Sequence, residues 1–318
     1  MSLKLLRQAL NSHRSLTPMW RQQPLKDGYD VVIIGAGPAG LATAIQLQRY
    51  DINFTIVEKD HIGGLLWNAN LVENYPGFPR GISGPKLINL IVKQLNFIDV
   101  PITRDMIKFV KWEGDNYIIR GRDTYRPKIL VVASGTKPKP IHIMIPDVAR
   151  NRVFRDVVPL LGVRNKTILI VGAGDAAFDH ALNLTKNGNS VTILNRGKQV
   201  KCLELLKNRA DADPRILYRT NLSVKQIVFD QNESRLIVRC DSGESLDADY
   251  LIFAVGREPQ LDFLTNSVQE NEQMLRAQGR LYFIGDVCNG TLRQTAIAAG
   301  DGLRAAMQIY QIFKEGTL

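Results

Sequence analysis

Two glycine-rich stretches have the spacing of phosphate-binding turns. Gly35–Gly40 reads G-x-G-x-x-G, with glycine at 35, 37 and 40, and Gly172–Ala177 reads G-x-G-x-x-A, with glycine at 172 and 174. In such a turn the first glycine permits a tight bend, the second lets the backbone approach a pyrophosphate, and the third small residue lets helix and strand pack. The following helix presents free N–H groups and a positive dipole end to the phosphates. Two such stretches predict two dinucleotide sites.

The residues 23 positions after each first glycine differ in charge. Glu58 closes the segment FTIVE, where a carboxylate can accept hydrogen bonds from ribose hydroxyls. Asn195, at the equivalent place, is uncharged, and the basic residues that follow it are Arg196, Lys198 and Lys201. This pattern favours an adenosine 2′-phosphate, and hence NADPH over NADH, at the second site. A basic loop after a strand also arises by chance, so NADH stays open.

The elements around these turns repeat one pattern. The apolar run Val31–Ile34 reads as a strand buried on both faces, and the apolar LATAIQL segment after the first turn reads as a helix. KTILIV, SVTILN, LVVASG and LIFAVG read as further buried strands, and a helix is expected to begin after Ser83. DMIKFVKWEG and NYIIRGRD predict a small antiparallel layer. The fold class is therefore α/β, with two Rossmann-like dinucleotide-binding domains.

Composition bounds the remaining possibilities. The chain has 318 residues, 45% hydrophobic and 23% charged, and no apolar run approaches the roughly 18 residues of a membrane helix. Cys202, Cys240 and Cys288 lie 38 and 48 positions apart. This spacing offers no C-x-x-C, disulfide framework or metal cluster, which indicates a reducing compartment. We expect no metal and a cytoplasmic location.

The net charge of +10 includes +4 from residues 1–27. These residues form a basic N-terminal extension with no apolar h-region. A structural tail is the simpler interpretation, and an organelle-targeting segment is the alternative. The surplus over the remaining chain favours acidic partners through long-range attraction. No recognisable nucleic-acid-binding module is present, so nucleic acid is not expected as a partner.

In these motifs the chain resembles the low-molecular-weight thioredoxin reductase family of FAD- and NAD(P)-dependent flavoproteins. The resemblance runs from about residue 28 to 313 and rests on GAGPAG with Glu58, GGLL, VENYPGFP, the ASG and AVG segments, VGAGDAA, and GDV with RQTAIAAG. It implies an FAD domain of residues 28–137 and 257–318. The NAD(P) domain, residues 138–256, is inserted into it. The resemblance also implies a homodimer.

The resemblance also implies the ligands of each cofactor. For FAD they are Gly35, Gly37, Pro38, Ala39, Gly40, Glu58, Lys59, Gly64, Leu65, Asn74, Gly285, Asp286, Arg293, Gln294 and Thr295. For NAD(P)H they are Gly172, Gly174, Asp175, Ala176, Asn195, Arg196 and Lys201. No catalytic side chain is named, because hydride transfer from a nicotinamide to flavin requires no general acid or base.

Departures from the family pattern bear on the electron acceptor. The family carries a C-x-x-C whose sulfurs lie 17 and 14 positions ahead of the second fingerprint, and those positions here are Arg155 and Val158. A dithiol relay to thioredoxin by that route is therefore excluded. The H-R-R-x-x-x-R clamp for a 2′-phosphate reads Asn195, Arg196, Gly197 and, at its last position, Lys201. One arginine is lost and another becomes lysine, which weakens the expected selectivity for NADPH.

These features predict an FAD-dependent NAD(P)H oxidoreductase without an active-site disulfide. Residues 153–182 are similar to ferredoxin (or flavodoxin)–NADP reductases of thioredoxin-reductase type, and the positive charge suits an acidic ferredoxin or flavodoxin. Against this, the chain stops at Leu318 without the aromatic extension usual in those reductases. The alternatives are a two-electron reductase or oxidase of a quinone, small disulfide or oxygen, and a non-catalytic FAD-binding protein.

Overall fold

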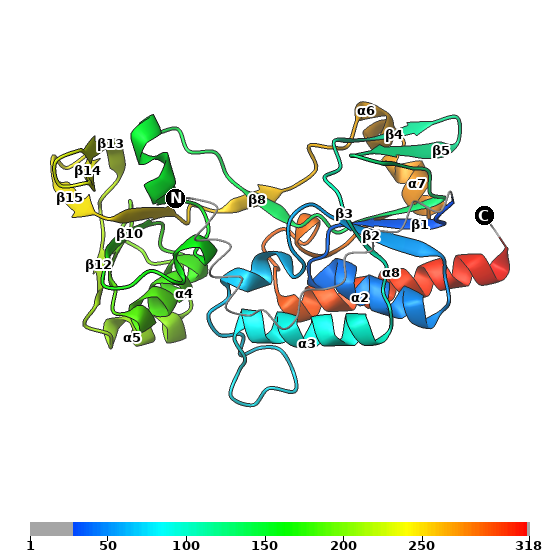
Figure 1. Cartoon of the computed structure of the whole chain (residues 1–318), viewed down its shortest axis with the longest axis horizontal. Helices are drawn as coiled ribbons and strands as arrows, with labels where there is room; N and C mark the ends of the chain where they lie inside the picture. Colours follow the sequence, from blue (N-terminus) through cyan, green and yellow to red (C-terminus); the bar gives the residue numbers. More distant parts are fainter. Residues whose placement is uncertain (1–27, 317–318) are drawn as a thin grey trace. The chain divides into compact units, whose positions relative to one another are not determined.

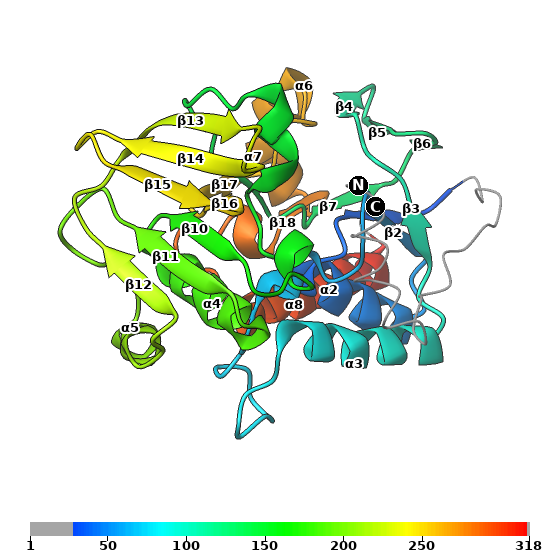
Figure 2. The same cartoon turned by 60° about the vertical axis from the view of Figure 1, so that its left-hand side comes forward.

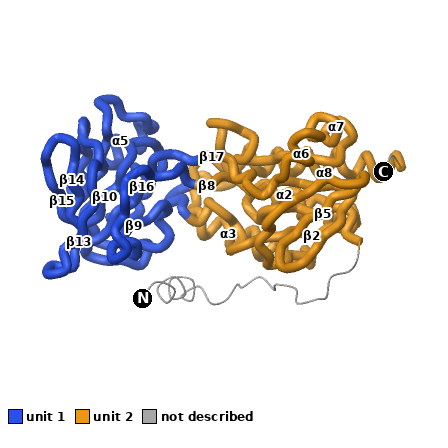
Figure 3. Tube along the Cα trace, turned by 90° about the horizontal axis from the view of Figure 1, so that it is seen from above, with its two compact units in different colours: residues 1–15, 68–71, 138–257 blue, residues 16–67, 72–137, 258–318 orange. Residues whose placement is uncertain are grey.

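The computed structural model describes residues 28–316, which form two compact units (Figure 3). Unit 1 comprises residues 68–71 and 138–257, and unit 2 comprises residues 28–67, 72–137 and 258–316. One α/β unit is thus inserted into the other, which confirms the predicted fold class. The expectations about residues 1–27 lie outside the described residues.

Unit 2 is built on a five-stranded parallel sheet in the order β18-β7-β1-β2-β3. Its strands are β1 (Val31–Ile34), β2 (Phe54–Glu58), β3 (Ile102–Arg104), β7 (Ile129–Val132) and β18 (Leu281–Phe283). β1 is the middle strand, and all four of its residues are buried. The uninterrupted apolar run therefore reflects burial on both faces, as expected for a central parallel strand.

Three helices lie together on one face of this sheet (Figure 1). They are α2 (Pro38–Arg49), α3 (Gly84–Phe97) and α8 (Thr295–Glu315). The other face packs against an antiparallel layer and two short helices, which share one core with β1. These elements are β4 (Phe109–Glu113), β5 (Asn116–Arg120), β6 (Thr124–Tyr125), α6 (Asn266–Glu270) and α7 (Glu272–Ala277). Both the predicted antiparallel layer and the helix that begins after Ser83 are present.

Unit 1 repeats the parallel arrangement in the order β12-β11-β10-β16-β9 (Figure 2). Its parallel strands are β9 (Val153–Phe154), β10 (Thr167–Val171), β11 (Ser190–Leu194), β12 (Ile216–Arg219) and β16 (Tyr250–Phe253). The helices α4 (Asp175–Leu184) and α5 (Glu204–Asp211) cover one face. The other face packs against an antiparallel sheet of β13 (Val224–Asp230), β14 (Arg235–Cys240) and β15 (Ser245–Ala248).

Short elements complete the chain. β8 (Thr136–Pro138) and β17 (Arg257–Pro259) pair with each other where the chain passes from one unit to the next. The 3₁₀ turns are η1 (Gly64–Asn68), η2 (Asp147–Arg152), η3 (Val158–Leu160), η4 (Thr185–Asn187) and η5 (Gly285–Val287). Among residues 28–316, no helix has the length and apolar character needed to cross a membrane.

The crossing of α2 and α8 brings two backbones into direct contact. A Cβ added at Gly302 of α8 would overlap the carbonyl oxygen of Ala39 and lie 3.0 Å from the backbone nitrogen of Thr43. The Thr43 hydroxyl lies 3.0 Å from the carbonyl oxygen of Ala39 and 3.2 Å from that of Gly302, so it can donate to either. The beginning of α2, where the first fingerprint ends, is therefore held by α8.

We expect Gly302→Ala to destabilise the protein by about 1–3 kcal/mol, because the added methyl group must push two packed backbones apart. Gly300→Ala is the matched control, since a Cβ at Gly300 of the same helix meets no atom within 4 Å. The control should be neutral or stabilise by about 0.4–1 kcal/mol through a less flexible unfolded chain. Denaturant unfolding of both variants measures the difference, and equal stability of the two would contradict the packing argument.

Candidate functional site

The first glycine turn lies against the neighbouring strand. Gly35 has a φ of +107°, and a Cβ there would overlap the carbonyl oxygen of Ala133, the residue after β7. A Cβ at Gly40 would overlap the carbonyl oxygen of Gly35. A Cβ at Gly37, in contrast, would meet no atom within 4 Å. The turn is thus closed where it packs on the sheet and open at its middle glycine, which fits a bound pyrophosphate.

Glu58 is fixed at the end of β2 by two backbone groups. Its Oε2 accepts a hydrogen bond from the N–H of Ala36 at 2.8 Å, and its Oε1 accepts one from the N–H of Asp60 at 2.8 Å. The residue is only 8% exposed. Each carboxylate oxygen keeps a further lone pair, so the side chain can still accept from ribose hydroxyls. The adjacent Lys59 is exposed.

The GGLL segment packs on the first turn. The N–H of Gly63 donates to the carbonyl oxygen of Ala36 at 2.7 Å, and a Cβ at Gly64 would lie 3.4 Å from the Cα of Gly37. Gly64 begins η1, which also contains Leu65. The structure therefore brings this predicted flavin-binding segment to the open side of the fingerprint, where Pro38 and Ala39 begin α2.

The C-terminal predicted ligands reach the same place. A Cβ at Gly285 of η5 would lie 2.8 Å from the Cβ of Ala39, so the GDV turn with Asp286 lies beside the beginning of α2. The side chain of Asp301, from α8, accepts from the N–H of Gly285 at 3.2 Å and from Asn289 at 2.6 Å. Asp301 was missed by the sequence reasoning, although a carboxylate within an apolar helix beside glycines is a usable signal.

The loop after η1 connects to the beginning of α8. The amide of Asn74 donates to Gln294 Oε1 at 2.6 Å. Gln294 precedes Thr295, the first residue of α8, and follows Arg293. The predicted FAD ligands Asn74 and Gln294, which are 220 positions apart in the sequence, thus contact each other in unit 2.

The second glycine turn reproduces the first in unit 1. Gly172 has a φ of +120°, and a Cβ there would overlap the carbonyl oxygen of Ala254, the residue after β16. Gly174 is open except for the carbonyl oxygen of Lys201 at 4.0 Å. α4 begins with Asp175 and Ala176, and Ala177 is fully buried. This turn also fits a pyrophosphate.

The side chains of two predicted nucleotide ligands form hydrogen bonds with other residues of the chain. Asn195 is 8% exposed, and its amide bonds the Gln199 carbonyl at 2.9 Å and the Tyr218 hydroxyl at 2.8 Å. Asp175 Oδ1 accepts from the N–H of Leu203 at 2.8 Å. Both side chains therefore tie the loop after β11, whereas Arg196 and Lys201 on that loop are exposed.

Residues 68–71, which separate two segments of unit 2 in the sequence, belong to unit 1. Asn68 Oδ1 accepts from the N–H groups of Val157 and Val158 at 3.2 and 3.4 Å, and its amide donates to Asp156 at 3.3 Å. Asp156 also forms an ion pair with Arg257 at 2.9 Å. The domain boundaries expected from the sequence did not include this excursion, because neither asparagine nor aspartate in a loop indicates a distant partner.

Asp179, which lies in α4, binds the backbone of residues 68–71. Its Oδ2 accepts from the N–H of Asn70 at 2.8 Å. Burial raises the pKa of Asp179 to about 6, although the Asn70 N–H and the charge of Lys186 oppose the shift. The neighbouring His180 is 6% exposed, and burial lowers the pKa of its imidazole to about 4, with Arg257 adding to the effect.

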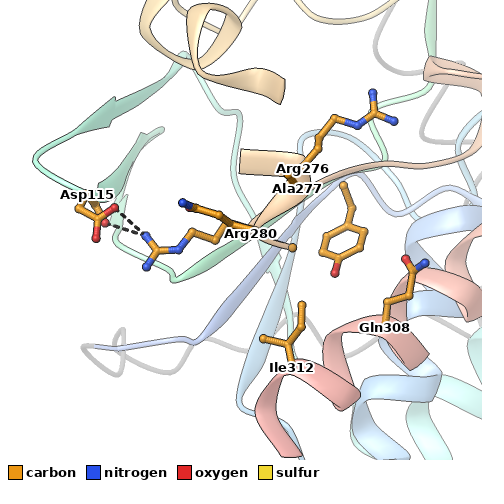
Figure 4. A pocket seen from close by; sticks show the side chains of 9 residues that line it. Asp115, Arg276, Ala277, Arg280, Gln308 and Ile312 are labelled. Atoms are coloured by element: carbon orange, nitrogen blue, oxygen red, sulfur yellow. Dashed lines mark hydrogen bonds and ion pairs between the residues drawn. The ribbon is translucent and has the colours of Figure 1, made fainter. Parts of the chain in front are cut away.

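A separate pocket of about 650 Å³ lies in unit 2 between the turn before β18 and the last turns of α8 (Figure 4). Arg280 pairs there with Asp115 at 3.0 Å, and Arg276 pairs with Glu272 at 3.1 Å. Its lining contains none of the predicted cofactor ligands. Among residues 28–316, His, Cys, Asp and Glu side chains form no group of three that could hold a metal ion.

Comparisons with known proteins agree with this arrangement. A family model described as pyridine nucleotide-disulphide oxidoreductase matches residues 29–302. The chain is 28% identical over 303 residues to a thioredoxin reductase of Mycolicibacterium smegmatis, covering 88% of this chain and 94% of that protein. The crystal structure of Lactococcus lactis thioredoxin reductase in its FR conformation has a TM-score of 0.78 and 26% identity, covering 90% of this chain and 99% of that one. Bacillus cereus bacillithiol disulfide reductase shares the fold, with a TM-score of 0.70 and 21% identity over 90% of this chain and 99% of that chain.

We expect Glu58→Gln to weaken FAD binding by roughly 10- to 100-fold, because a charged hydrogen bond contributes about 1.5–3 kcal/mol. The amide places a donor against one of the two N–H groups that Glu58 accepts. Asp60→Asn is the matched control, since it removes one exposed acid and keeps the backbone N–H. Fluorescence titration of the apoprotein with FAD measures both, and an equal loss in the control would contradict the role of Glu58.

Asp179 predicts a pH dependence of stability. The folded protein holds the Asp179 proton more tightly than the unfolded chain, so the unfolding free energy falls as the pH rises from about 4 to about 6. Asp179→Asn has no carboxyl group at this position, so its unfolding free energy lacks this contribution to the fall. Its stability relative to wild type should rise by about 2–3 kcal/mol across that interval and stay constant above it.

Denaturant unfolding from pH 4 to 8 tests this difference. Asp147→Asn is the control, since it removes a carboxylate whose side chain is 87% exposed. If the difference curve of Asp179→Asn matched that of the control, burial would not disfavour the charged carboxylate of Asp179.

Proposed function

Because the chain belongs to the pyridine nucleotide-disulphide oxidoreductase family, we propose that it transfers electrons from NAD(P)H through FAD to an external acceptor without a protein dithiol. The family assignment confirms the predicted oxidoreductase class and the use of FAD and NAD(P)H. Ferredoxin or flavodoxin is the acceptor that we propose first. One NAD(P)H supplies two electrons, so each turnover reduces two one-electron carriers.

The observation that carries this proposal is the structure at the positions of the family disulfide. Arg155 donates to the carbonyl oxygen of Lys139 at 2.7 Å, and the N–H of Val158 donates to Asn68. Neither side chain can form a disulfide. The segment is instead held by hydrogen bonds to Asn68, so its position is fixed without sulfur chemistry.

The three cysteines are unsuited to replace that disulfide. All of them are free. Cys240, the last residue of β14, is buried in the core, and Cys202 follows the loop after β11. Burial raises the pKa of each thiol, Cys288 included. Because the thiolate is the reactive form, these side chains are poor partners for thiol–disulfide exchange.

The residues around both glycine turns would bind and orient the cofactors. Glu58 and the open face at Gly37 would hold the ribose and pyrophosphate of FAD, and Gly174 would face the pyrophosphate of NAD(P)H. FAD, when bound, accepts two electrons from a nicotinamide and releases them singly or as a pair. The protein supplies position and electrostatic environment, and no general acid or base is needed.

Charge favours an acidic carrier. Residues 138–257 contain 18 Lys and Arg against 13 Asp and Glu, whereas the described residues of unit 2 contain 18 against 17. The cationic surplus of the described chain therefore lies mainly in unit 1. Such a surplus steers an acidic carrier toward the protein at low ionic strength. The homodimer and the cytoplasmic location stay predictions.

The same lack of a reactive thiol pair supports a second candidate, a direct two-electron reductase or oxidase of a small acceptor. The two candidates differ in their dependence on a carrier. A non-catalytic FAD-binding protein is the remaining alternative, and it differs from both because NAD(P)H would not reduce its flavin.

Anaerobic mixing of the FAD-loaded protein with NADPH or NADH should bleach the flavin absorbance. Added ferredoxin or flavodoxin should then carry electrons to cytochrome c, at a rate that falls roughly tenfold as added salt screens the charges. Rapid peroxide formation in air without a carrier would instead support the oxidase. Absence of bleaching with either nucleotide would overturn the proposed function.

A cysteine variant tests the lack of a dithiol step. Cys202→Ser combined with Cys288→Ser leaves one cysteine, so no intramolecular disulfide can form. We expect flavin reduction and carrier reduction to stay within about twofold of wild type, since no thiolate takes part. Loss of carrier reduction with normal flavin bleaching would show that a thiol passes the electrons.

A further inference from the structure

The pocket at the carboxyl end of α7 lies in unit 2, and none of the predicted cofactor ligands lines it (Figure 4). Its volume of about 650 Å³ falls within the range of small-molecule sites, which is roughly 300–1,000 Å³. Its lining comes from the turn between β4 and β5, from the turn that joins α7 to β18, from β18 itself and from the last turns of α8. The electron transfer proposed above uses none of these residues.

Arg280 is fixed at one side of this pocket by both its backbone and its side chain. Its N–H donates to the carbonyl oxygen of Leu275 at 2.8 Å, and its own carbonyl oxygen accepts from the N–H of Leu130 at 2.9 Å. Its Nη1 donates to the carbonyl oxygen and to Oδ1 of Asp115, at 3.1 and 3.0 Å. The guanidinium carbon lies over the ring of Trp112, 5.4 Å from the centroid, and the side chain is only 20% exposed. The cation is therefore positioned before a ligand binds.

These contacts leave part of the guanidinium group of Arg280 unused. Only Nη1 donates to another described residue, so the edge formed by Nε and Nη2 keeps its donors. Arg276 repeats the pattern. Its Nη1 donates to Glu272 at 3.1 Å, and its guanidinium carbon lies over the ring of Phe283, 5.8 Å from the centroid. A free guanidinium edge matches the two oxygens of a carboxylate.

Two neutral groups add further donors to the pocket. The hydroxyl of Tyr282 on β18 and the amide of Gln308 on α8 form no hydrogen bond with another residue in the range 28–316. Burial raises the pKa of Tyr282 to about 12, so its hydroxyl is protonated at neutral pH and can donate. The lining is apolar at Ala277 and Ile312. The pocket thus combines cations, neutral donors and apolar surface.

Gly279 brings the turn before β18 against α8. Its φ is +66°, and a Cβ there would overlap Cδ1 of Ile312 and lie 3.1 Å from the hydroxyl oxygen of Tyr282. Its N–H donates to the carbonyl oxygen of Arg276 at 3.1 Å. A residue without a side chain is therefore required at this contact, and it keeps the Tyr282 hydroxyl beside the turn that carries Arg280.

We propose that this pocket binds a small organic monocarboxylate, in which one carboxylate group is attached to an apolar or aromatic body. The lining contains two arginines and one aspartate, a net charge of +1, which a single carboxylate balances. The free edge of Arg280 binds the carboxylate, and Tyr282 and Gln308 donate further hydrogen bonds. Ile312 contacts the apolar body, and Arg276 adds long-range attraction. The site goes beyond the proposed electron transfer and does not depend on its acceptor.

Fluorine NMR titration of the FAD-loaded protein with 4-fluorobenzoate tests the proposal. Two matched compounds are 4-fluorobenzamide, which keeps the ring without the charge, and fluoroacetate, which keeps the charge without the ring. We expect 4-fluorobenzoate to bind with a Kd of roughly 1 mM, and the other two compounds to bind at least about tenfold more weakly. Equal binding of the amide, or no binding of 4-fluorobenzoate up to about 20 mM, would overturn the proposal.

Three variants locate the bound compound. Tyr282→Phe removes only a hydroxyl that has no partner among the described residues, so it should leave thermal unfolding unchanged and weaken 4-fluorobenzoate binding roughly two- to tenfold. Arg280→Lys keeps the charge and loses the planar edge, and it should weaken binding at least as much. Arg304→Gln removes an exposed cation of α8 outside the pocket, so it is the control for net charge and should bind like wild type.

The same variants separate this pocket from the two cofactor sites. A compound bound at either cofactor site would not contact Tyr282 or Arg280. Wild-type affinity in both Tyr282→Phe and Arg280→Lys would therefore overturn the proposal. A loss in Arg304→Gln as large as in Arg280→Lys would also overturn it, because net charge alone would then explain the binding.

Discussion

Both cofactor sites depend on one backbone contact. In each unit the first glycine of the fingerprint lies against the carbonyl oxygen of the residue that follows the next parallel strand: Gly35 against Ala133, and Gly172 against Ala254. Each glycine has a positive φ, which an L side chain rarely adopts. Because glycine has no side chain, the turn can pack against the neighbouring strand at this point. The turn then opens toward the ligand, and the next helix begins at the carboxyl end of the parallel strand.

Polar residues at these sites mainly support the loops. Glu58 holds two backbone N–H groups and still has lone pairs for a ribose, whereas Asn195 and Asp175 use their side chains to fasten one loop. A fixed loop presents its charges without losing side-chain and backbone entropy on binding.

The sequence determined the fold more fully than it determined the contacts of the site. Buried runs such as Val31–Ile34, and a glycine at the end of a strand, are local signals, so the strands, the turns and the inserted unit could be predicted. The contacts of Asn68 with Val157 and of Asn195 with Tyr218 join residues 89 and 23 positions apart. Short polar side chains form no sequence pattern that identifies a distant partner, so these hydrogen bonds could be found only in the structure.

Hydrogen bonds hold the segment at the positions of the family disulfide. The family pattern places its two sulfurs at Arg155 and Val158. The N–H of Val158 donates here to Asn68, as does that of Val157, and Asp156 lies between Asn68 and Arg257. A disulfide that takes part in electron transfer must open and close, which requires room and a reactive thiolate. Here the same backbone N–H groups are tied to a carboxamide that has no redox chemistry. The segment therefore holds loop residues 68–71 in unit 1.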